Sequence, residues 1–192
     1  MGQEPFVHPL GLCESASVGS GTRVWAFAHV MAGAVVGRDC NLGDHSFIED
    51  GVRIGDRVTV KNGVAVWTGV TVEDDVFLGP YATFTNDLRP RAHRRVAPGD
   101  FVPTVIARGA TIGANATVVC GIRVGRHAFV GAGAVVTSDV PDHALVVGNP
   151  SRQIGWVCEC GETLDDALRC RCGHAYSSGA GGVVRVGLDP SG

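Results

Sequence analysis

The sequence has few aromatic residues, little charge and no excess of basic residues. Aromatic residues make up 6% of the 192 positions and charged residues 18%, whereas glycine occurs 28 times. The formal net charge is −3, so no overall positive field indicates binding to nucleic acid or to an anionic membrane. Because few large rings are available, the composition favours a β-rich core of small side chains.

Long apolar segments are also absent. The N-terminal stretch MGQEPFVHPLG has neither the basic region nor the apolar region of a secretory signal. No apolar run approaches the roughly 18 residues that span a bilayer. The length fits one domain, or one domain with a small appendage. We therefore expect a cytoplasmic protein that binds neither membrane nor nucleic acid.

Apolar residues recur at every sixth position along most of the chain. A first series of such anchor residues runs from Val18 to Phe84, and a second series, in a new phase, runs from Ile106 to Val136. Four residues after each anchor stands a second residue that is small or apolar and never charged. A period of six fits neither an α-helix nor a long strand, but it fits short strands joined by tight turns.

This repeat predicts a parallel β-helix. Three hexapeptides, about 18 residues, would close one triangular coil, and successive coils would stack. The anchor series extends back to Leu12 and Phe6, so the first coil is expected near the N-terminus. On one of the three faces the residue after the anchor is never glycine, and Glu49 and Trp67 are two examples. That corner of the solenoid therefore carries larger side chains.

An insertion at residues 86–104 leaves the solenoid from this corner. It contains four arginines within seven residues, namely Arg89, Arg91, Arg94 and Arg95. Guanidinium groups match phosphate oxygens in bidentate geometry. A solvated loop is the alternative, but long insertions in compact repeats are uncommon unless they are functional. The loop is therefore a candidate binding site for an anionic substrate.

Several stretches together resemble the hexapeptide-repeat acyltransferases, which are left-handed β-helix trimers that use acetyl-CoA. They are FVHP at Phe6, GTRVWAFAHVMAGAVVG at Gly21, VEDDVFLGPYATFTNDLRPRA at Val72, GATIGANATVVCG at Gly109 and VGAGAVVTSDVPDHALVVGNPSRQIGWV at Val130. Within that superfamily the sequence is similar to bacterial N-acetyltransferases of UDP- or dTDP-linked 3-amino sugars. One departure is Thr68, where the family pattern leads us to expect an acidic residue.

The resemblance implies an all-β protein whose residues 1–155 form a left-handed parallel β-helix and assemble as a homotrimer. It implies an acetyl-CoA-dependent N-acetyltransferase for a nucleotide-linked amino sugar. An acyltransferase for another amine or for a hydroxyl acceptor, such as a secondary-metabolite sugar, is the main alternative. A γ-type carbonic anhydrase, with three histidines around zinc, and a non-catalytic scaffold are less favoured.

Acyl transfer to an amine needs a held nucleophile, donors for the oxyanion and an acceptor for the proton. Asn86 and Asp87 open the loop directly after a strand and are the candidates that orient the amine. His29, expected at a corner, is the candidate base, although a structural role is equally open. The departing CoA thiolate could instead take the proton. The predicted substrate-binding residues are Glu49, Trp67, Arg89 and Arg91.

For CoA, the resemblance implies a groove between neighbouring subunits along the C-terminal coils. Small residues there would allow pantetheine amides to reach the backbone, and a turn near residue 150 would shape the nucleotide end. The expected cofactor-binding residues are Ala114, Gly131, Ala132, Gly133, Asn149, Pro150 and Arg152.

The tail CECGETLDDALRCRCGH contains two C-x-C-G units separated by nine residues. Four thiolates at Cys158, Cys160, Cys170 and Cys172 predict a tetrahedral structural zinc, with His174 as a substitute ligand and free thiols as the alternative. Residues 156–178 are expected to form a zinc-ribbon-like tail, because so short a segment lacks a sufficient core of its own. The glycine-rich residues 179–192 are expected to be mobile.

Overall fold

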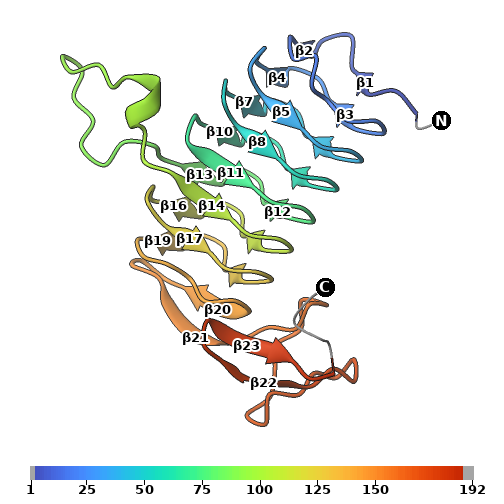
Figure 1. The fold of residues 1–192 in the computed structure, drawn as a ribbon, viewed down its shortest axis with the longest axis vertical. Coiled ribbons are helices and arrows are strands. Elements are labelled where there is room, and N and C mark those ends of the chain that lie inside the picture. Colours follow the sequence, from blue (N-terminus) through green and yellow to red (C-terminus); the bar gives the residue numbers. More distant parts are fainter. Residues whose placement is uncertain (1–2, 188–192) are drawn as a thin grey trace.

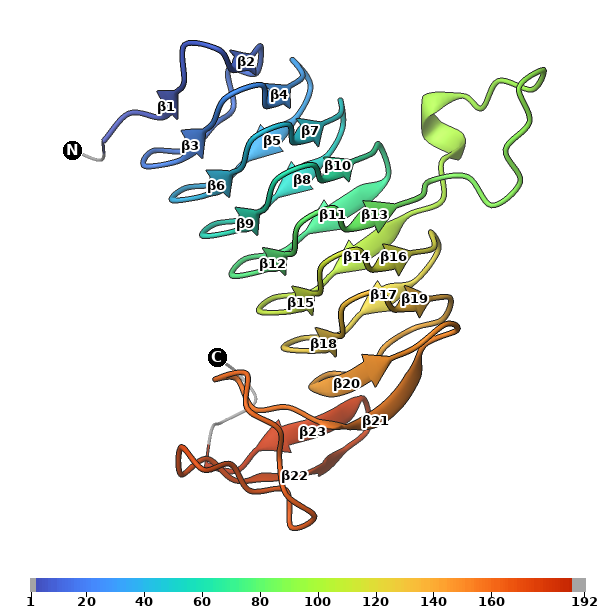
Figure 2. The ribbon, with the colours of Figure 1, turned by 180° about the vertical axis from the view of Figure 1, so that it is seen from behind.

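The fold is a solenoid of three parallel sheets, seen in a computed structural model that describes residues 3–187 (Figures 1 and 2). Within this range there is one short 3-10 helix, η1 (Pro98–Asp100), and no α-helix. No helix among these residues has the length and apolar character needed to cross a membrane. The chain visits the three sheets in turn, so each coil adds one strand to each sheet.

Two-residue strands make up most of each sheet. Sheet A contains β1 (Phe6–Val7), β3 (Arg23–Val24), β6 (Asn41–Leu42), β9 (Thr59–Val60), β12 (Phe77–Leu78), β15 (Thr111–Ile112), β18 (Phe129–Val130), β20 (Ala144–Val147) and β21 (Arg152–Trp156). Sheet B contains β2 (Leu12–Cys13), β4 (His29–Val30), β7 (Phe47–Ile48), β10 (Ala65–Val66), β13 (Thr83–Phe84), β16 (Thr117–Val118) and β19 (Val135–Val136). Sheet C contains β5 (Val35–Val36), β8 (Arg53–Ile54), β11 (Val70–Val72), β14 (Thr104–Ile106) and β17 (Arg123–Val124).

The anchors of the six-residue repeat fill the solenoid. From Val24 to Phe84, and from Ile106 to Val136, every anchor is at most 3% exposed. The second set, four residues later, is buried as well and includes Thr22, whose hydroxyl donates to the Gly37 carbonyl at 2.8 Å. The prediction of short strands that stack with a period of six is therefore confirmed for these coils.

The first coil departs from the predicted phase. Phe6 pairs with Arg23 and Leu12 pairs with His29, so Phe6 and Leu12 occupy outward positions and are 45% and 52% exposed. Their assignment as anchors is wrong. A strand alternates its two faces at every residue, so a spacing of five instead of six between Cys13 and Val18 moves each predicted anchor to the outer face.

The basic insertion interrupts the solenoid without changing its register. Ile54 pairs with Val72, 18 residues later, whereas Val72 pairs with Ile106, 34 residues later, so the insertion adds 16 residues. Across it, β13 still pairs with β16 in sheet B. The inserted residues project away from the stacked coils and carry η1 (Figures 1 and 2).

The tail is docked on the last coil. Strand β21 pairs antiparallel with β20, and the hairpin of β22 (Tyr176–Gly179) and β23 (Gly182–Arg185) follows. A second, small core contains Cys158, Leu164, Cys170, Tyr176 and Val183, and Trp156 packs against both cores.

Two expectations about the tail need correction. The boundary predicted at residues 155 and 156 falls inside β21, whose pairing with β20 continues the solenoid. Residues 182–185, expected to be mobile, form β23, because Val183 is buried in the second core. The remainder of that expectation, residues 188–192, lies outside the described residues.

Candidate functional site

The turns from sheet B to sheet C form one corner of the solenoid, which we call the acceptor corner: residues 49–52, 67–69 and the start of the insertion at 85–87. The buried anchors Ile48, Val66 and Phe84 precede these turns on three successive coils. Because each turn follows a short strand that is paired within sheet B, Trp67 lies in register with Glu49, and Asn86 lies in register with Thr68.

Hydrogen bonds join these three turns. The Thr68 amide and hydroxyl both donate to Glu49 Oε2, at 2.7 and 2.9 Å. Asn86 Nδ2 donates to the Thr68 carbonyl at 3.2 Å, and the Val102 amide donates to the Asn86 carbonyl at 3.0 Å. Two of the predicted site residues, Glu49 and Asn86, are thus brought together through Thr68, which sequence reasoning noted only as a departure from the family pattern.

Aromatic side chains cover the outer face of sheet B beside this corner. The Phe47 ring lies 5.4 Å from the Trp67 ring and 5.3 Å from the His29 ring, between centroids. His29 lies in β4 and not at a corner, which corrects that expectation. Its Nε2 contacts Glu14 Oε2 at 2.9 Å. The structure therefore brings Trp67 to the acceptor corner and pairs His29 with a carboxylate elsewhere on the face.

The insertion folds around a cavity of about 440 Å³. The Asp87 carboxylate accepts the Arg89 amide at 2.7 Å and lies 3.6 Å from the Arg94 guanidinium. Residues that line the cavity are Asp87, Leu88, Arg89, Arg94, Arg95, Val96, Asp100 and Val102. Arg91 is not among them, and its guanidinium donates to the Pro90 carbonyl. Sequence reasoning named Arg89 and Arg91 as ligands, whereas the cavity adds Arg94 and Arg95.

Three turns on the last coils form a second corner, the donor corner: residues 113–116 and 131–134, which lead from sheet A to sheet B, and residues 148–151, which join β20 to β21 within sheet A. A Cβ atom on Gly113 would stand 2.5 Å from the Ala132 amide, so adjacent turns pack backbone to backbone. The Ser151 amide donates to the Val135 carbonyl at 2.8 Å, which adds the last turn to this column. Predicted cofactor-binding residues found in these turns are Ala114, Gly131, Ala132, Gly133, Asn149 and Pro150. Arg152 follows as the first residue of β21.

The two corners lie at opposite ends of the strands of sheet B: turns of the donor corner precede these strands and turns of the acceptor corner follow them. Within one chain, Asn86 and Ala132 are separated by the strands of sheet B, because each of these strands connects one corner to the other. The insertion, however, projects outward beyond the solenoid (Figure 2). The structure therefore places the predicted acceptor and donor residues at different corners of one chain.

The four tail cysteines converge. Their Sγ atoms all lie within 4.8 Å of one another, with 3.6 Å between Cys158 and Cys172 and 3.5 Å between Cys160 and Cys170. Each C-x-C-G unit forms the same tight turn, in which the glycine amide donates to the first cysteine carbonyl, at 2.9 Å for Gly161 and 3.0 Å for Gly173. Both glycines have positive φ, 91° and 94°, which side chains disfavour. This donor set suits a soft, tetrahedral divalent metal.

Hydrogen bonds stabilise the thiolate form of Cys158. Burial alone would raise the pKa of this thiol, but the Cys160 amide and the Tyr176 hydroxyl, 3.2 Å away, donate to the sulfur and lower its pKa to about 6. His174 Nδ1 lies 3.5 Å from the same sulfur. Metal binding needs thiolates, and these contacts favour one at Cys158, whereas the pKa values of Cys160 and Cys170 are raised, so a metal ion would have to displace the protons of those thiols.

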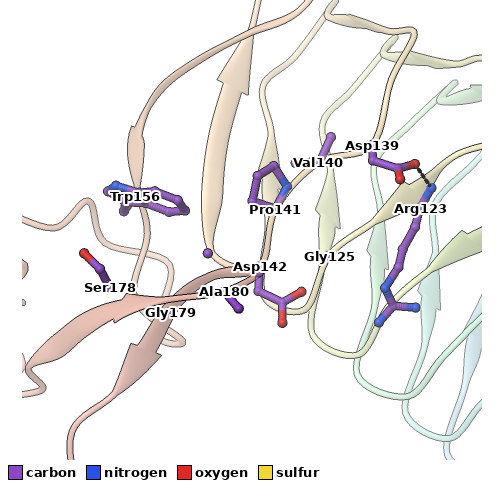
Figure 3. Close-up of a pocket in the computed structure, with 12 residues that line it drawn as sticks. Arg123, Gly125, Asp139, Val140, Pro141, Asp142, Trp156, Ser178, Gly179 and Ala180 are labelled. Carbon is purple, nitrogen blue, oxygen red and sulfur yellow. Dashed lines mark hydrogen bonds between the residues drawn. The ribbon is translucent and has the colours of Figure 1, made fainter.

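A larger cavity, of about 620 Å³, lies between the last coil and the tail hairpin. Figure 3 shows Trp156 on the tail side and Arg123 on the solenoid side of this cavity. None of the predicted donor or acceptor residues lines it. The smaller loop cavity is the candidate substrate site, because it combines Asp87 with three arginines and adjoins the acceptor corner.

Comparison with known proteins identifies the family. A family model described as bacterial transferase hexapeptide (six repeats) matches residues 15–50 and 103–138. Over 182 residues the chain is 48% identical to a dTDP-3-amino-3,6-dideoxy-alpha-D-galactopyranose 3-N-acetyltransferase from Aneurinibacillus thermoaerophilus, and the match covers 93% of each protein. The chain belongs to the bacterial hexapeptide-repeat N-acetyltransferases.

One solved structure and a second sequence relative agree with this assignment. A hexapeptide-repeat acetyltransferase from Vibrio cholerae, solved in complex with acetyl coenzyme A, has a TM-score of 0.54 and 28% identity over 66% of this chain and 72% of that chain. A shorter match, 40% identical over 73 residues, is to a 2,3,4,5-tetrahydropyridine-2,6-dicarboxylate N-acetyltransferase from Staphylococcus aureus, of which it covers 30%. The predicted left-handed β-helix and acetyltransferase class are confirmed.

Proposed function

We propose that the protein transfers the acetyl group of acetyl-CoA to the 3-amino group of a dTDP-linked 3-amino-3,6-dideoxy sugar. The observation that carries this proposal is the match to the Aneurinibacillus enzyme, which extends over 93% of both chains and so includes both corners and the insertion. The acceptor corner supports it, because Glu49 and Asn86 present oxygen atoms beside a basic loop. A carboxylate and an amide oxygen suit an amine, and the arginines suit a diphosphate.

The chemistry needs no strong protein base. The amine nitrogen attacks the thioester carbonyl carbon, the C–S bond then breaks, and the amine proton passes to the departing CoA thiolate, so that an amide and CoA thiol are the products. Glu49 and Asn86 hold the amine in position for attack. Trp67 offers an apolar surface to the sugar ring. Asp87 fixes the start of the loop through the Arg89 amide.

The working unit in this proposal is a homotrimer. The donor corner of one chain carries acetyl-CoA along Ala114, Gly131 to Gly133, and the turn at Asn149 and Pro150, with Arg152 at its end. The insertion of a neighbouring chain then brings Asn86 to the thioester. Separation of the two corners across sheet B supports this arrangement, since neither corner alone holds both substrates.

The cysteine tail in this proposal binds one structural zinc ion through Cys158, Cys160, Cys170 and Cys172. Zinc prefers four thiolates in tetrahedral geometry, and the twin turns already place four sulfur atoms together. A cluster of four metal-binding thiolates suits a reducing compartment, so we propose that the enzyme acts in the cytoplasm.

A direct assay tests the function. The protein is incubated with acetyl-CoA and either dTDP-3-amino-3,6-dideoxygalactose or its UDP-linked counterpart, and the sugar is analysed by mass spectrometry. Mass detection is preferable to a thiol reagent, because the chain itself contributes seven cysteines. We expect acetylation of the dTDP sugar. If neither amino sugar gains an acetyl group while acetyl-CoA binds, the assigned substrate class is wrong.

A further inference from the structure

Thr68 uses all three of its polar groups at the acceptor corner. Its amide and its hydroxyl donate to Glu49 Oε2 on the preceding coil, and its carbonyl accepts Asn86 Nδ2 from the following coil. The hydroxyl also lies 2.8 Å from the Asp50 carbonyl, so its single hydrogen is shared between two acceptors. Thr68 is thus the residue that links Glu49 to Asn86.

Bonds between a carboxylate and a backbone amide of the neighbouring coil occur in two directions. In several turns the carboxylate accepts an amide from the preceding coil, as Asp50 does from Gly33 at 2.7 Å and Asp56 does from Arg38 at 2.8 Å. At Thr68 the later residue donates and the earlier residue, Glu49, accepts, as also occurs between Arg108 and Glu73 at 2.9 Å. The Thr68 hydroxyl adds a second bond to the same carboxylate oxygen, so one residue supplies two donors to Glu49 Oε2.

These bonds leave two oxygen atoms available. In the part of the chain that the structure describes, the contacts of Glu49 use Oε2, and the side-chain contact of Asn86 uses Nδ2. Glu49 Oε1 and Asn86 Oδ1 therefore remain as acceptors. Both side chains are partly exposed at the corner from which the insertion departs. An acceptor-only pair selects a group that is rich in N–H donors.

We propose that Thr68 is a positioning residue that turns Glu49 and Asn86 into an oxygen pair for the amine of the acceptor sugar, so that the corner selects an amine over a hydroxyl. An ammonium group or amine offers two or more N–H donors, whereas a hydroxyl offers one and leaves an acceptor unpaired. This inference depends on the proposed function, because it deepens the role of the same site.

An acidic residue at position 68 would repel the Glu49 carboxylate instead of donating to it. An aspartate side chain has no hydrogen to give when ionised, and it would stand against the Glu49 carboxylate that the hydroxyl now contacts. Like charges at this distance repel, so Glu49 would turn away from its present orientation. The presence of threonine, where the family resemblance predicts an acid, therefore keeps a single carboxylate at this position.

Kinetics of matched variants test the proposal on the full chain. Thr68→Val removes the hydroxyl but keeps the backbone amide and the shape, and we expect kcat with dTDP-3-amino-3,6-dideoxygalactose to fall about 10-fold, with KM for acetyl-CoA unchanged. Thr68→Ser restores the hydroxyl and should recover most of the lost kcat. Thr68→Asp should lower kcat/KM for the amino sugar more than Thr68→Val does. Thr71→Val makes the same change on the outer face of sheet C and should alter neither constant.

The outcomes separate the two proposals. A Thr68→Val protein with the kcat of the parent overturns the positioning role while the proposed function stands. The positioning role is also overturned if Thr68→Val raises both KM values equally and lowers the thermal midpoint, because that pattern indicates a structural residue. If the unmodified protein acetylates neither amino sugar, the proposed function fails and this inference fails with it.

Discussion

The Sγ atoms of Cys158 and Cys172 lie 3.6 Å apart, although 14 residues separate them in the sequence. Zinc–thiolate bonds of about 2.3 Å in a tetrahedron put neighbouring sulfur atoms about 3.8 Å apart. The spacing of the two C-x-C-G turns is therefore close to that of a formed site, and a bound ion would need only small movements of the side chains.

The first prediction is the metal content of the tail. Purified, reduced protein should contain about one zinc per chain, and Cys170→Ser should lose it, because three remaining thiolates hold the ion less tightly. Circular dichroism should show that the β-helix persists, since stacked coils are stabilised by their neighbours. Cys13→Ser, which changes a cysteine outside the tail, should keep its zinc. Metal analysis that finds no zinc in the reduced parent protein would contradict the assignment.

The second prediction links the tail to acetyl-CoA. Strand β21 joins the turn that contains Asn149 and Pro150 to Cys158, and it is paired with β20 along its length. Removal of zinc by a chelator should therefore loosen the donor corner and raise KM for acetyl-CoA several-fold, with a smaller effect on KM for the sugar. Equal increases in both constants would show that the tail does not act through the donor corner.

The third prediction concerns pH. Burial lowers the pKa of His127, and the neighbouring His143, whose ring centroid lies 5.0 Å away, lowers it further. Burial likewise lowers the pKa of His143. An unfolded histidine takes up a proton near pH 6.5, whereas the folded rings resist it, so stability is present above this pH and is lost as the pH falls through the folded pKa.

Thermal midpoints between pH 8 and pH 5 measure this effect. His127→Phe keeps an aromatic ring against His143 and removes one titrating group, so its midpoint should fall less steeply with acid than that of the parent. Acid also displaces zinc from thiolates, and the comparison between variant and parent removes that shared contribution. If the thermal midpoints of the two proteins fall in parallel as the pH decreases, His127 does not cause the pH dependence of stability.

Much of the fold could be predicted from the sequence because the repeat is simple. Each anchor from Val24 onward is buried by the same neighbours one coil away, so a period of six determines strands, sheets and register together. The prediction failed for the first coil, because the repeat there is one residue shorter between Cys13 and Val18, which moves Phe6 and Leu12 from the inner to the outer face. The strand β23 was also missed, because a glycine-rich segment gives no periodic signal.

The candidate site was less predictable than the fold. Asn86 and Glu49 could be named, because they follow anchors at one corner. Their connection through Thr68 could not, since a hydroxyl that bonds to the preceding coil leaves no pattern in the sequence. The arginines of the insertion differ in direction, and an irregular loop has no period from which the inward side chains, Arg94 and Arg95, could be separated from Arg91.

The fourth prediction is the oligomeric state. The donor and acceptor corners lie at opposite ends of the strands of sheet B, and in the proposed function the insertion of one chain meets the donor corner of another. Light scattering should give the mass of three chains. A stable monomer that binds CoA tightly and turns over substrate would show that one chain contains a complete site.

The last prediction divides the insertion by function. Arg94 and Arg95 line the loop cavity, whereas Arg91 donates to the Pro90 carbonyl and stands outside it. If the cavity holds the anionic part of the nucleotide sugar, Arg95→Ala should raise KM for the sugar about 10-fold or more, because a charged hydrogen bond is lost, and KM for acetyl-CoA should not move. Arg91→Ala is the matched control and should raise KM for the sugar less. Asn86→Ala should instead lower kcat about 10-fold, since it removes a contact that orients the amine in the transition state. If Arg91→Ala has the larger effect on KM for the sugar, the anion is held by Arg91, as the sequence alone led us to expect, and the cavity is not the nucleotide site.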